Sequence, residues 1–570
     1  MQIKAVVCGL SIVFLAACQT FKPGADLILL DARINTQDAA QHLAQAIAIK
    51  DGRIIAIGTN AQALQAQGHN SQVVRMAGKM VLPGLIDSHI HSIEGALAMN
   101  ACSMDDEKLS IEQLSEKIHA CDQQQPGDDW LQVLNVRGVG TVLDRYILDG
   151  ILSHRPLWLV STDAHVAWGN NKALELAGVD GTTVAPSTGK ISHDSKGEPT
   201  GMFRDGATAL VSKHIPPMPL QQRVDALSET LKQFQQTGIT AFLEANSNAQ
   251  SIETFCALYQ QGKLTASVTI ALGSDGTADD AEFSRLLDLK NQAEQCGVKA
   301  DTIKLFADGV MEFPTQTAGL LSPYFDIEGK TTSNSGELYL PPTQLNQFVL
   351  MAAERGFSLH VHAIGDGAVR EVFDAFTLLR QQAPTSDTRL SMAHLQLIDP
   401  SDFKRFAELD VIASVQLLWA QPDEYSFDAI APYLGEDRQR LVYPAASLLN
   451  QGATLAGGSD WNVSSFNPFA AIAIGQSRLN AEHPEYAGLN VNEALTTEQL
   501  LTAYTINAAK VLGQQNNIGS LQVGKQADLI VLAAPIDNNS SAFDITATQV
   551  LATVIKGRVV FGELIQTSKN

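Results

Sequence analysis

Short apolar stretches alternate with amphipathic stretches along most of the chain, and this alternation is the strongest pattern in the sequence. Amphipathic segments such as 220–236 and 342–355 have the spacing of helices packed on one face. The apolar stretches have the length of buried strands, and they are 81–87, 239–244, 266–271, 302–306, 358–362, 389–394, 411–415 and 454–459. Strands and helices that alternate in this way form parallel sheets, so the pattern predicts an α/β protein with a TIM (β/α)8 barrel.

Both ends of the chain have a different pattern, with short strands separated by tight turns. Ala46–Ile57 contains the turn Lys50-Asp51-Gly52-Arg53 between apolar flanks, which is typical of a hairpin. The far end of the chain repeats this design in 529–532 and 550–561. We therefore predict a small β-sandwich domain that is built from both termini, from residues 26–80 and 515–565.

The remaining residues, 81–514, are predicted to form the barrel. Residues 95–215 interrupt the alternation between the first and second strands. This stretch is too long for a loop, and we expect it to be an inserted subdomain.

The N-terminal residues have the pattern of a targeting segment. Lys4 precedes an apolar run over residues 5–17 that is too short to span a bilayer, and Cys18 follows it. The stretch 15–18 resembles the lipobox of bacterial lipoproteins, so residues 1–17 are expected to be a signal peptide and 18–25 a tether lipidated at Cys18. A plain secretory signal and an uncleaved anchor are the alternatives. Gln19 favours an outer-membrane lipoprotein that faces the periplasm.

Charge and cysteine content narrow the function classes. The formal net charge of −22 is spread along the chain and repels phosphate backbones, which argues against nucleic-acid binding. In an oxidising periplasm Cys102 and Cys121 are candidates for a local disulfide, with free buried thiols as the equal alternative. The chain contains no CxxC pair, so a cysteine zinc cage is not supported.

The residues that carry chemistry lie at the ends of the predicted strands. His89 and His91 follow the first strand, and side chains at i and i+2 of a strand point the same way, so they can share a metal ion. His362, His394 and Asp460 end later strands. Because barrel active sites form at the carboxyl ends of the strands, these residues are candidates for one site.

Lys304 and His360 occupy strand interiors. A buried charged lysine is costly, and Lys304 either pairs with Asp308 or Asp460, or is carboxylated to bridge two metal ions. His360 shares a face with His362, but His362 is nearer the strand end and is the expected ligand. His360 is expected to contact the ligands without binding the metal ion itself.

Several stretches together resemble the amidohydrolase superfamily, specifically the YtcJ-like amidohydrolase family 3. They are 82–91, 163–178, 197–201, 303–309, 362–366, 393–396, 459–461 and 521–529. The resemblance covers about residues 26 to 562 and implies a metal-dependent hydrolase with a TIM barrel and a small β-sandwich.

The resemblance also implies ligands for one or two divalent ions, expected to be zinc, with iron, manganese and cobalt open. Carried over by motif, they are His89, His91 and Asp460 for one ion, His362 and His394 for the second, and carboxylated Lys304 between the two. A site with one ion would remove the need for the carbamate.

In such a site, a bound metal ion lowers the pKa of its water towards about 7 and gives hydroxide that attacks the substrate carbonyl. Asp460 is expected to take the proton and pass it to the leaving amine, while His394 or His165 stabilises the carbonyl oxygen. His165 is also a substrate-binding candidate, unless it is structural. Further pocket candidates are Trp130, Arg137, Glu312, Thr317 and Trp461, with buried packing the safer reading for the tryptophans.

The expected function is hydrolysis of non-peptide C–N bonds in linear amides, such as N-acyl or N-formyl compounds. A cyclic-amide hydrolase or a deaminase would use the same site. A sensing or scaffold lipoprotein is a further alternative, ranked lower because His91, His362 and Asp460 are all present. The expected partners are a small-molecule amide and the lipid anchor at Cys18, with no nucleic acid, and a homodimer is left open.

Overall fold

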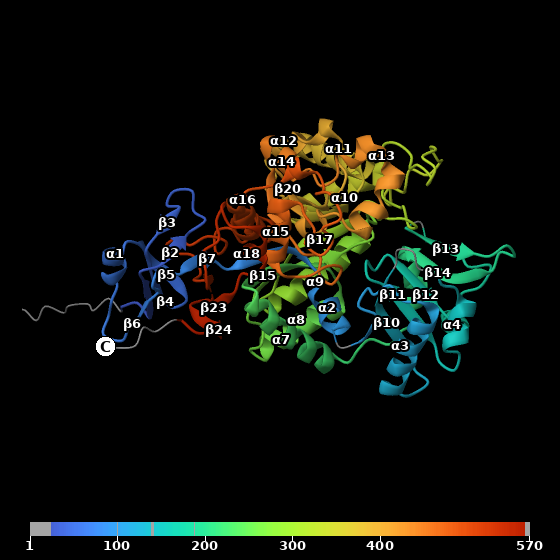
Figure 1. Ribbon diagram of the computed structural model, residues 1–570, viewed down its shortest axis with the longest axis horizontal. Coiled ribbons are helices and arrows are strands. Elements are labelled where there is room, and N and C mark those ends of the chain that lie inside the picture. Colours follow the sequence, from blue (N-terminus) through green and yellow to red (C-terminus); the bar gives the residue numbers. More distant parts are fainter. Residues whose placement is uncertain (1–23, 100, 138–141, 187, 565–570) are drawn as a thin grey trace, which may run out of the picture.

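The computed structural model describes residues 24–99, 101–137, 142–186 and 188–564. The predicted signal peptide, Cys18 and most of the predicted tether lie outside these residues. Figure 1 shows three parts along the longest axis: strands from both chain ends, a central barrel wrapped by helices, and an inserted sheet. Within the described part of the chain, no helix combines the length and the apolar character that a membrane span needs.

The central part is an eight-stranded parallel sheet, as predicted. In sheet order its strands are β21 (Thr454–Gly457), β20 (Val411–Val415), β19 (Leu390–His394), β18 (Ser358–Ala363), β17 (Lys299–Phe306), β16 (Ser267–Gly273), β15 (Ile239–Ser247) and β8 (Leu85–Ile90). Helices that cover it include α7 (Leu220–Gln236), α8 (Ala249–Gln260), α9 (Asp280–Gln295), α10 (Pro342–Glu354), α11 (Asp366–Gln382) and α15 (Pro468–Ser477). The predicted α/β barrel is therefore confirmed.

Hydrogen bonds from the segment after β21 complete the barrel beside β8. The Asp460 N–H donates to His89 O at 2.8 Å, and the His91 N–H donates to Trp461 O at 2.7 Å. The end of the last strand and the end of the first are thus held together by main chain, which brings their side chains to one place.

The predicted first strand, 81–87, is divided between two sheets. β7 (Met80–Pro83) pairs with β22 (Leu529–Leu532) and β2 (Arg33–Asn35) outside the barrel, and β8 begins at Leu85. Gly84 lies at the junction, where a Cβ atom would stand 2.1 Å from Thr240 Oγ1. One apolar run therefore serves both domains, and a pattern of burial alone does not reveal the change of sheet.

The two chain ends form two facing sheets, as predicted. One has the order β5 (Arg53–Gly58), β4 (Ala46–Lys50), β1 (Leu27–Leu30), β6 (Gln72–Arg75), and the other β24 (Arg558–Gly562), β23 (Val550–Ile555), β22, β7, β2, β3 (Leu43–Ala44). Leu29 and Ile47 from the first sheet share one buried cluster with Leu529 and Val554 from the second. This shared core joins residues that are some 500 positions apart in the sequence.

The insertion forms a third, mixed sheet. Its order is β13 (Gly189–His193), β14 (Pro199–Asp205), β12 (Val166–Gly169), β11 (Leu157–Ser161), β10 (Leu131–Val136), β9 (Cys102–Ser103). Cys102 forms a disulfide with Cys121 of α3 (Ile111–Gln124), which favours the disulfide over free thiols. A second disulfide, Cys256–Cys296, joins α8 to the end of α9 and was not predicted.

Candidate metal centre

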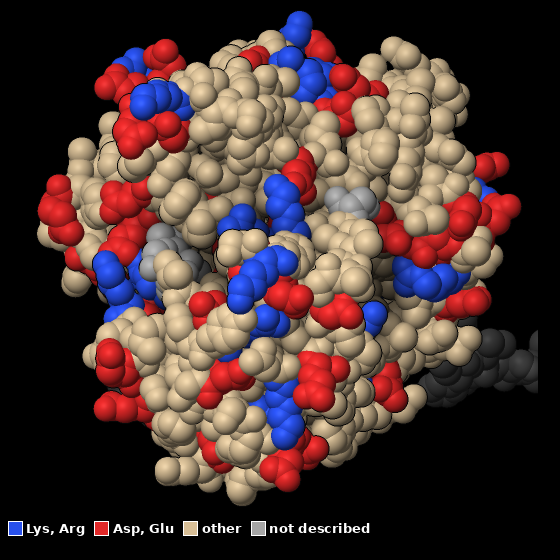
Figure 2. All heavy atoms as spheres, turned by 90° about the vertical axis from the view of Figure 1, so that its right-hand side faces the viewer, with Lys and Arg blue, Asp and Glu red and all other residues tan. Residues whose placement is uncertain are grey.

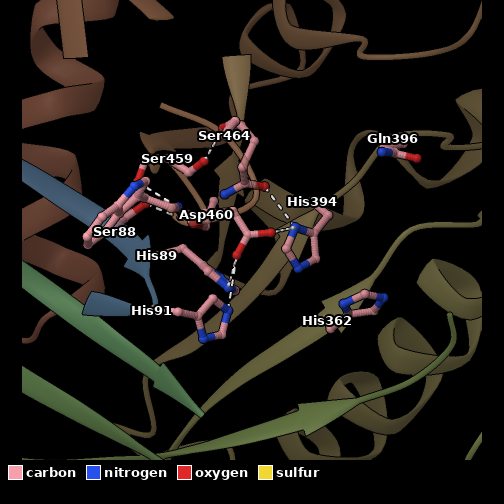
Figure 3. Close-up of polar contacts among 12 residues, drawn as sticks. Ser88, His89, His91, His362, His394, Gln396, Ser459, Asp460 and Ser464 are labelled. Atoms are coloured by element: carbon pink, nitrogen blue, oxygen red, sulfur yellow. Dashed lines mark hydrogen bonds and ion pairs between the residues drawn. The ribbon is translucent and has the colours of Figure 1, made fainter. Parts of the chain in front are cut away.

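Three imidazoles surround the Asp460 carboxylate at the carboxyl end of the barrel. His89 Nε2 lies 3.2 Å and His91 Nε2 3.1 Å from Asp460 Oδ1, and His394 Nδ1 lies 3.8 Å from Oδ2. Figure 3 shows the three rings grouped around the carboxylate. Ligand atoms of His89, His394 and Asp460 all lie within 4.8 Å of one another, close enough to hold one metal ion.

The chemistry of these donors fits a divalent cation. Asp460 Oδ1 is buried and has no hydrogen-bond partner, although two ring nitrogens face it. Burial acts to raise the pKa of Asp460, but the neighbouring imidazoles, His89 first, outweigh it and hold the pKa well below its usual value. Burial and the Lys304 charge lower the pKa of His89 to about 3. An ionised carboxylate and a neutral imidazole are the states that bind metal.

Main-chain geometry and Asp87 position these donors. Asp87 Oδ1 accepts hydrogen bonds from the N–H groups of His89 and Ser459, both at 3.0 Å. His394 and Asp460 have φ values of 78° and 53°, in the left-handed region that side chains other than glycine seldom adopt. Strained backbone at two of the donor positions is typical of a functional site.

His91 is positioned through a residue that the sequence did not single out. It directly precedes α2 (Ser92–Ala98), and the buried Glu244 of β15 accepts hydrogen bonds from Ser92 N at 2.9 Å and from Ser92 Oγ. The carboxylate therefore binds the first turn of α2. Because Glu244 is 152 positions from Ser92, no local signal in the sequence points to this pairing.

His394 is held by two further residues that sequence reasoning missed. Its Nδ1 lies 3.0 Å from Gln416 Oε1, just after β20, and its ring stacks on Trp419 with centroids 5.5 Å apart and an interplanar angle of 8°. A ring packed on one face and hydrogen-bonded at one nitrogen has a fixed orientation, which a metal ligand requires.

His362 lies beside this group without an ion pair to Asp460 in Figure 3. Its ring centroid is 4.5 Å from that of His394, and its Nε2 lies 3.0 Å from Gly309 O. Asp308 Oδ1 is 3.5 Å from the same nitrogen. His362 therefore borders the site, with Nε2 engaged by the loop that follows β17.

Lys304 is buried in the barrel and points to the metal donors. Its Nζ lies 3.4 Å from His89 Nε2 and 4.7 Å from the centroid of the Phe306 ring. Burial lowers its pKa to about 7. Of the two pairings considered from the sequence, Asp308 is engaged elsewhere, because its oxygens accept the N–H groups of Gly319, Ile364 and Gly365.

His165 connects the insertion to the barrel site. Its ring centroid is 5.9 Å from that of His362, and its Nδ1 lies 2.6 Å from Asp205 Oδ1. Burial acts to lower the pKa of His165, but the hydrogen bond and charge of Asp205 outweigh it and raise the pKa to about 9. The insertion thus supplies a side chain beside the candidate ligands, from the segment between β11 and β12.

The remaining pocket candidates are divided between the mouth of the barrel and packed interiors. Arg137, after β10, forms an ion pair with Glu424 and lies 5.5 Å from the centroid of the Tyr425 ring, so it joins the insertion to the segment after β20. Figure 2 shows the face of the molecule on this side, where acidic and basic side chains are interspersed. Trp130 lies at the other end of β10 from Arg137, directly before the first residue of the strand. It packs in the core of the insertion.

Glu312 and Thr317 lie in the long segment after β17. Glu312 Oε1 accepts a hydrogen bond from Gln396 Nε2 at 3.3 Å, two residues after His394, and burial raises the pKa of Glu312 to about 7. Thr317 Oγ1 accepts one from Val310 N at 3.2 Å and supports the loop that holds His362.

Trp461 follows Asp460 directly but packs into the barrel wall. Its ring makes edge contacts with Phe234 and Phe466, and a Cβ atom at Gly95 would stand 2.4 Å from it. The structure therefore gives Trp461 the packing role that the sequence left as the safer reading.

Comparison with known proteins agrees with this fold and site. The sequence profile of the amidohydrolase family matches residues 72–561. The chain is 30% identical to Protein LONG AFTER FAR-RED 3 of Arabidopsis thaliana, over 94% of this chain and 92% of that protein. It is 26% identical to N-substituted formamide deformylase of Arthrobacter pascens, over 93% of this chain and 97% of that protein.

The fold has relatives among solved structures. An uncharacterized metal-dependent hydrolase from Pyrococcus horikoshii superposes with a TM-score of 0.70 at 22% identity, over 90% of this chain and 99% of that one. The profile match extends over most of the chain and includes every candidate metal donor. The resemblance inferred from the motifs is confirmed, and the chain belongs to the amidohydrolase family as one of its hydrolases.

Proposed function

We propose that the protein hydrolyses the C–N bond of small linear amides, with N-formyl and N-acyl amines as the substrate class. The observation that carries this proposal is the convergence of three imidazoles on the buried Asp460 carboxylate, at the end of the barrel where such enzymes act. The relative named N-substituted formamide deformylase, which matches nearly the whole chain, supports the formyl amides as first substrates.

The residues around Asp460 would hold one divalent ion, which we propose to be zinc. His89 and His91 would supply Nε2 atoms and Asp460 an oxygen, and a ring nitrogen of His394 lies in the same group of ligand atoms as those of His89 and Asp460. Mixed histidine and carboxylate donors suit zinc in an open catalytic site. The chemistry that a bound ion supplies is polarisation of the amide carbonyl and a lower pKa for water, towards about 7.

The side chains then divide the remaining work. Asp460 accepts the proton from the attacking water and transfers it to the departing amine nitrogen, so that the C–N bond breaks and a carboxylate and an amine are released. His165, fixed by Asp205 beside His362, stabilises the carbonyl oxygen as negative charge develops. Arg137 and Glu312 would border the substrate at the mouth of the barrel.

The test measures bound metal and turnover on the same preparations. Purified protein is analysed for metals and assayed with N-formyl and N-acetyl derivatives of one amine, beside the variants Asp460→Asn and Asp437→Asn. Asp437 is fully exposed, so its variant controls for the loss of a carboxylate. We expect stoichiometric zinc and amine release that Asp460→Asn lowers at least 10³-fold and Asp437→Asn leaves unchanged. Metal-loaded protein that releases no amine from either series would contradict the proposal.

Intact mass distinguishes one ion from two. Lys304 lies 3.4 Å from His89 Nε2, so a carboxylated Lys304 could reach a second ion beside His362 and His394. We propose the one-ion site, which predicts one zinc per chain and an unmodified mass. Two metals per chain with a mass gain of carbon dioxide that disappears in Lys304→Ala would establish the bridged site instead.

We further propose that the protein works in an oxidising compartment, as expected of an exported lipoprotein anchored at Cys18. The disulfides Cys102–Cys121 and Cys256–Cys296 support this, because such bonds persist outside the reducing cytosol. Thiol labelling of protein taken directly from cells tests it, with four unreactive cysteines expected before reduction. Lipidation is read from the mass of the N-terminal peptide, and a Cys18→Ala variant serves as the control.

A further inference from the structure

A chain of buried hydrogen bonds extends from His89 into the barrel interior. His89 Nδ1 lies 2.7 Å from His360 Nε2, and His360 Nδ1 lies 2.8 Å from Ser391 Oγ. The Ser391 hydroxyl in turn lies 3.1 Å from Leu359 O. His360 and Ser391 are register partners on β18 and β19, and His89, His360 and Ser391 are 3% exposed or less.

The last partner in this chain determines the direction of every bond before it. Leu359 O can only accept, so the single proton of the Ser391 hydroxyl is donated there. Ser391 Oγ then accepts from the Nδ1–H of His360, whose Nε2 is left as an acceptor. That nitrogen accepts the Nδ1–H of His89. A neutral imidazole carries one ring proton, so His89 Nε2 keeps its lone pair.

His89 Nε2 is the nitrogen that faces Asp460 Oδ1, at 3.2 Å. If the chain ran the other way, the Ser391 proton would go to His360, Leu359 O would lose the hydroxyl hydrogen bond, and His89 Nε2 would carry a proton towards Asp460. That arrangement cannot bind a metal ion. Lys304 Nζ, 3.4 Å from His89 Nε2, is the other titratable group at this nitrogen and lies on β17, beside β18.

We propose that His360 and Ser391 are positioning residues that hold His89 in the Nδ1–H tautomer and keep its Nε2 lone pair available for the divalent ion. This inference rests on the metal dependence that we propose above. Residues behind a metal-binding histidine fix both the proton and the ring orientation, and their loss typically weakens metal binding by about 10- to 100-fold.

Zinc affinity, measured by competition with a chromophoric chelator, tests the role of Ser391 without any assay of turnover. Ser391→Ala removes the acceptor for His360 and is expected to bind zinc about 10- to 100-fold more weakly. Ser391→Thr keeps a hydroxyl and should recover most of the affinity. Ser414→Ala is the matched control, because Ser414 is equally buried on β20 and bonds to Ser88 Oγ at 2.8 Å. It should stay within about twofold of the wild type.

The tautomer itself is read by NMR of protein labelled with ¹⁵N histidine, with His89→Gln used to assign the His89 signals. We expect the metal-free wild type to carry its proton on Nδ1. His360→Gln keeps an oxygen that can accept this proton and should preserve the tautomer, whereas His360→Leu should lose it. Thermal unfolding of each metal-free variant checks that the barrel still folds.

The outcomes separate this inference from the proposed function. Wild-type zinc affinity in Ser391→Ala, or a proton on His89 Nε2 in the wild type, overturns the inference alone. The expected affinities in a protein that releases no amine support the inference and contradict the proposed substrate class. A wild type that binds no zinc overturns both.

Discussion

Asp308 offers the most direct test of how the structure holds His362. The side chain is completely buried, and its two oxygens accept three main-chain hydrogen bonds. Oδ1 accepts from Ile364 N at 3.0 Å, and Oδ2 accepts from Gly319 N at 3.0 Å and Gly365 N at 2.9 Å. This carboxylate therefore joins the segment after β17 to the segment after β18, which begins at Ile364, two residues after His362.

The variant Asp308→Asn keeps the shape but replaces one acceptor with a donor. With its amide oxygen at the Oδ2 position, both glycine hydrogen bonds survive, and the new NH2 group faces the N–H of Ile364. Two buried donors then lack acceptors, at about 1–3 kcal/mol each, for a total of about 2–6 kcal/mol. A change of about 2 kcal/mol in the free energy of local opening already corresponds to roughly 30-fold faster amide exchange.

Hydrogen–deuterium exchange followed by mass spectrometry measures this opening, on peptides that contain Gly319, Ile364 and Gly365. The measurement is made at pH 8, above the pKa of about 7 to which burial raises the Asp308 carboxyl, so that the wild type presents the carboxylate. We expect exchange at least 30-fold faster in these peptides, and a kcat about tenfold lower because His362 loses its fixed loop.

Asp366→Asn is the control on the same segment. Asp366 Oδ1 accepts from Leu321 N at 2.9 Å, and asparagine keeps that acceptor, so exchange should change little. If exchange in the three peptides is the same for Asp308→Asn, Asp366→Asn and the wild type, the carboxylate does not hold these loops and the reasoning is wrong.

Three further predictions concern stability. Burial raises the pKa of Asp528 to about 6 from 3.8, so the folded sandwich binds its proton more tightly than the unfolded chain and loses about 3 kcal/mol of stability as pH rises from 4 to 6. Asp528→Asn should remove this dependence in thermal scans, and an unchanged pH profile would contradict it. The Cys102–Cys121 disulfide joins residues 19 positions apart, and its removal should destabilise the insertion by about 3 kcal/mol. The double variant Cys102→Ala/Cys121→Ala should therefore have a lower melting temperature than the wild type. Trp461→Ala should cost about 3–5 kcal/mol through the cavity that it leaves, with the Michaelis constant of any remaining activity changed less than threefold. A large rise in that constant at unchanged stability would instead make Trp461 a substrate contact.

The eight barrel strands could be predicted because parallel strands that are buried on both faces are continuous apolar runs. The clustering of histidine and aspartate side chains at their ends could be predicted because these residues are costly in such runs unless they have a role, as at His89 and Asp460. The division of the first apolar run into β7 and β8 at Gly84 could not be predicted. Both strands are equally buried, and only the strand with which each one pairs differs.

Other features depend on contacts between distant parts of the chain. Glu244 is one polar residue among apolar neighbours on β15, and its role exists only because α2 begins beside it in space. The role of Gln416 likewise depends on the fold, because its contact with His394 joins the ends of two different strands. The Cys256–Cys296 disulfide joins residues 40 positions apart on two helices, a separation that carries no signature in one sequence.

The candidate metal donors His89 and His394 each have a polar partner that comes from another barrel strand or from the loop directly after it. Register partners on adjacent parallel strands point to the same side of the sheet, so a polar side chain beside one donor can come from the next strand at about the same level. Gln416, just after β20, lies beside His394 of the neighbouring β19 in this way, whereas His360 of β18 reaches His89 of β8 from a strand that is not its neighbour in the sheet. A polar residue inside a barrel strand is destabilising without such a partner. An apolar substitution at Gln416 leaves the buried His394 Nδ1 without its partner, so it should weaken zinc binding and also lower the thermal stability of the metal-free protein, by about 1–3 kcal/mol.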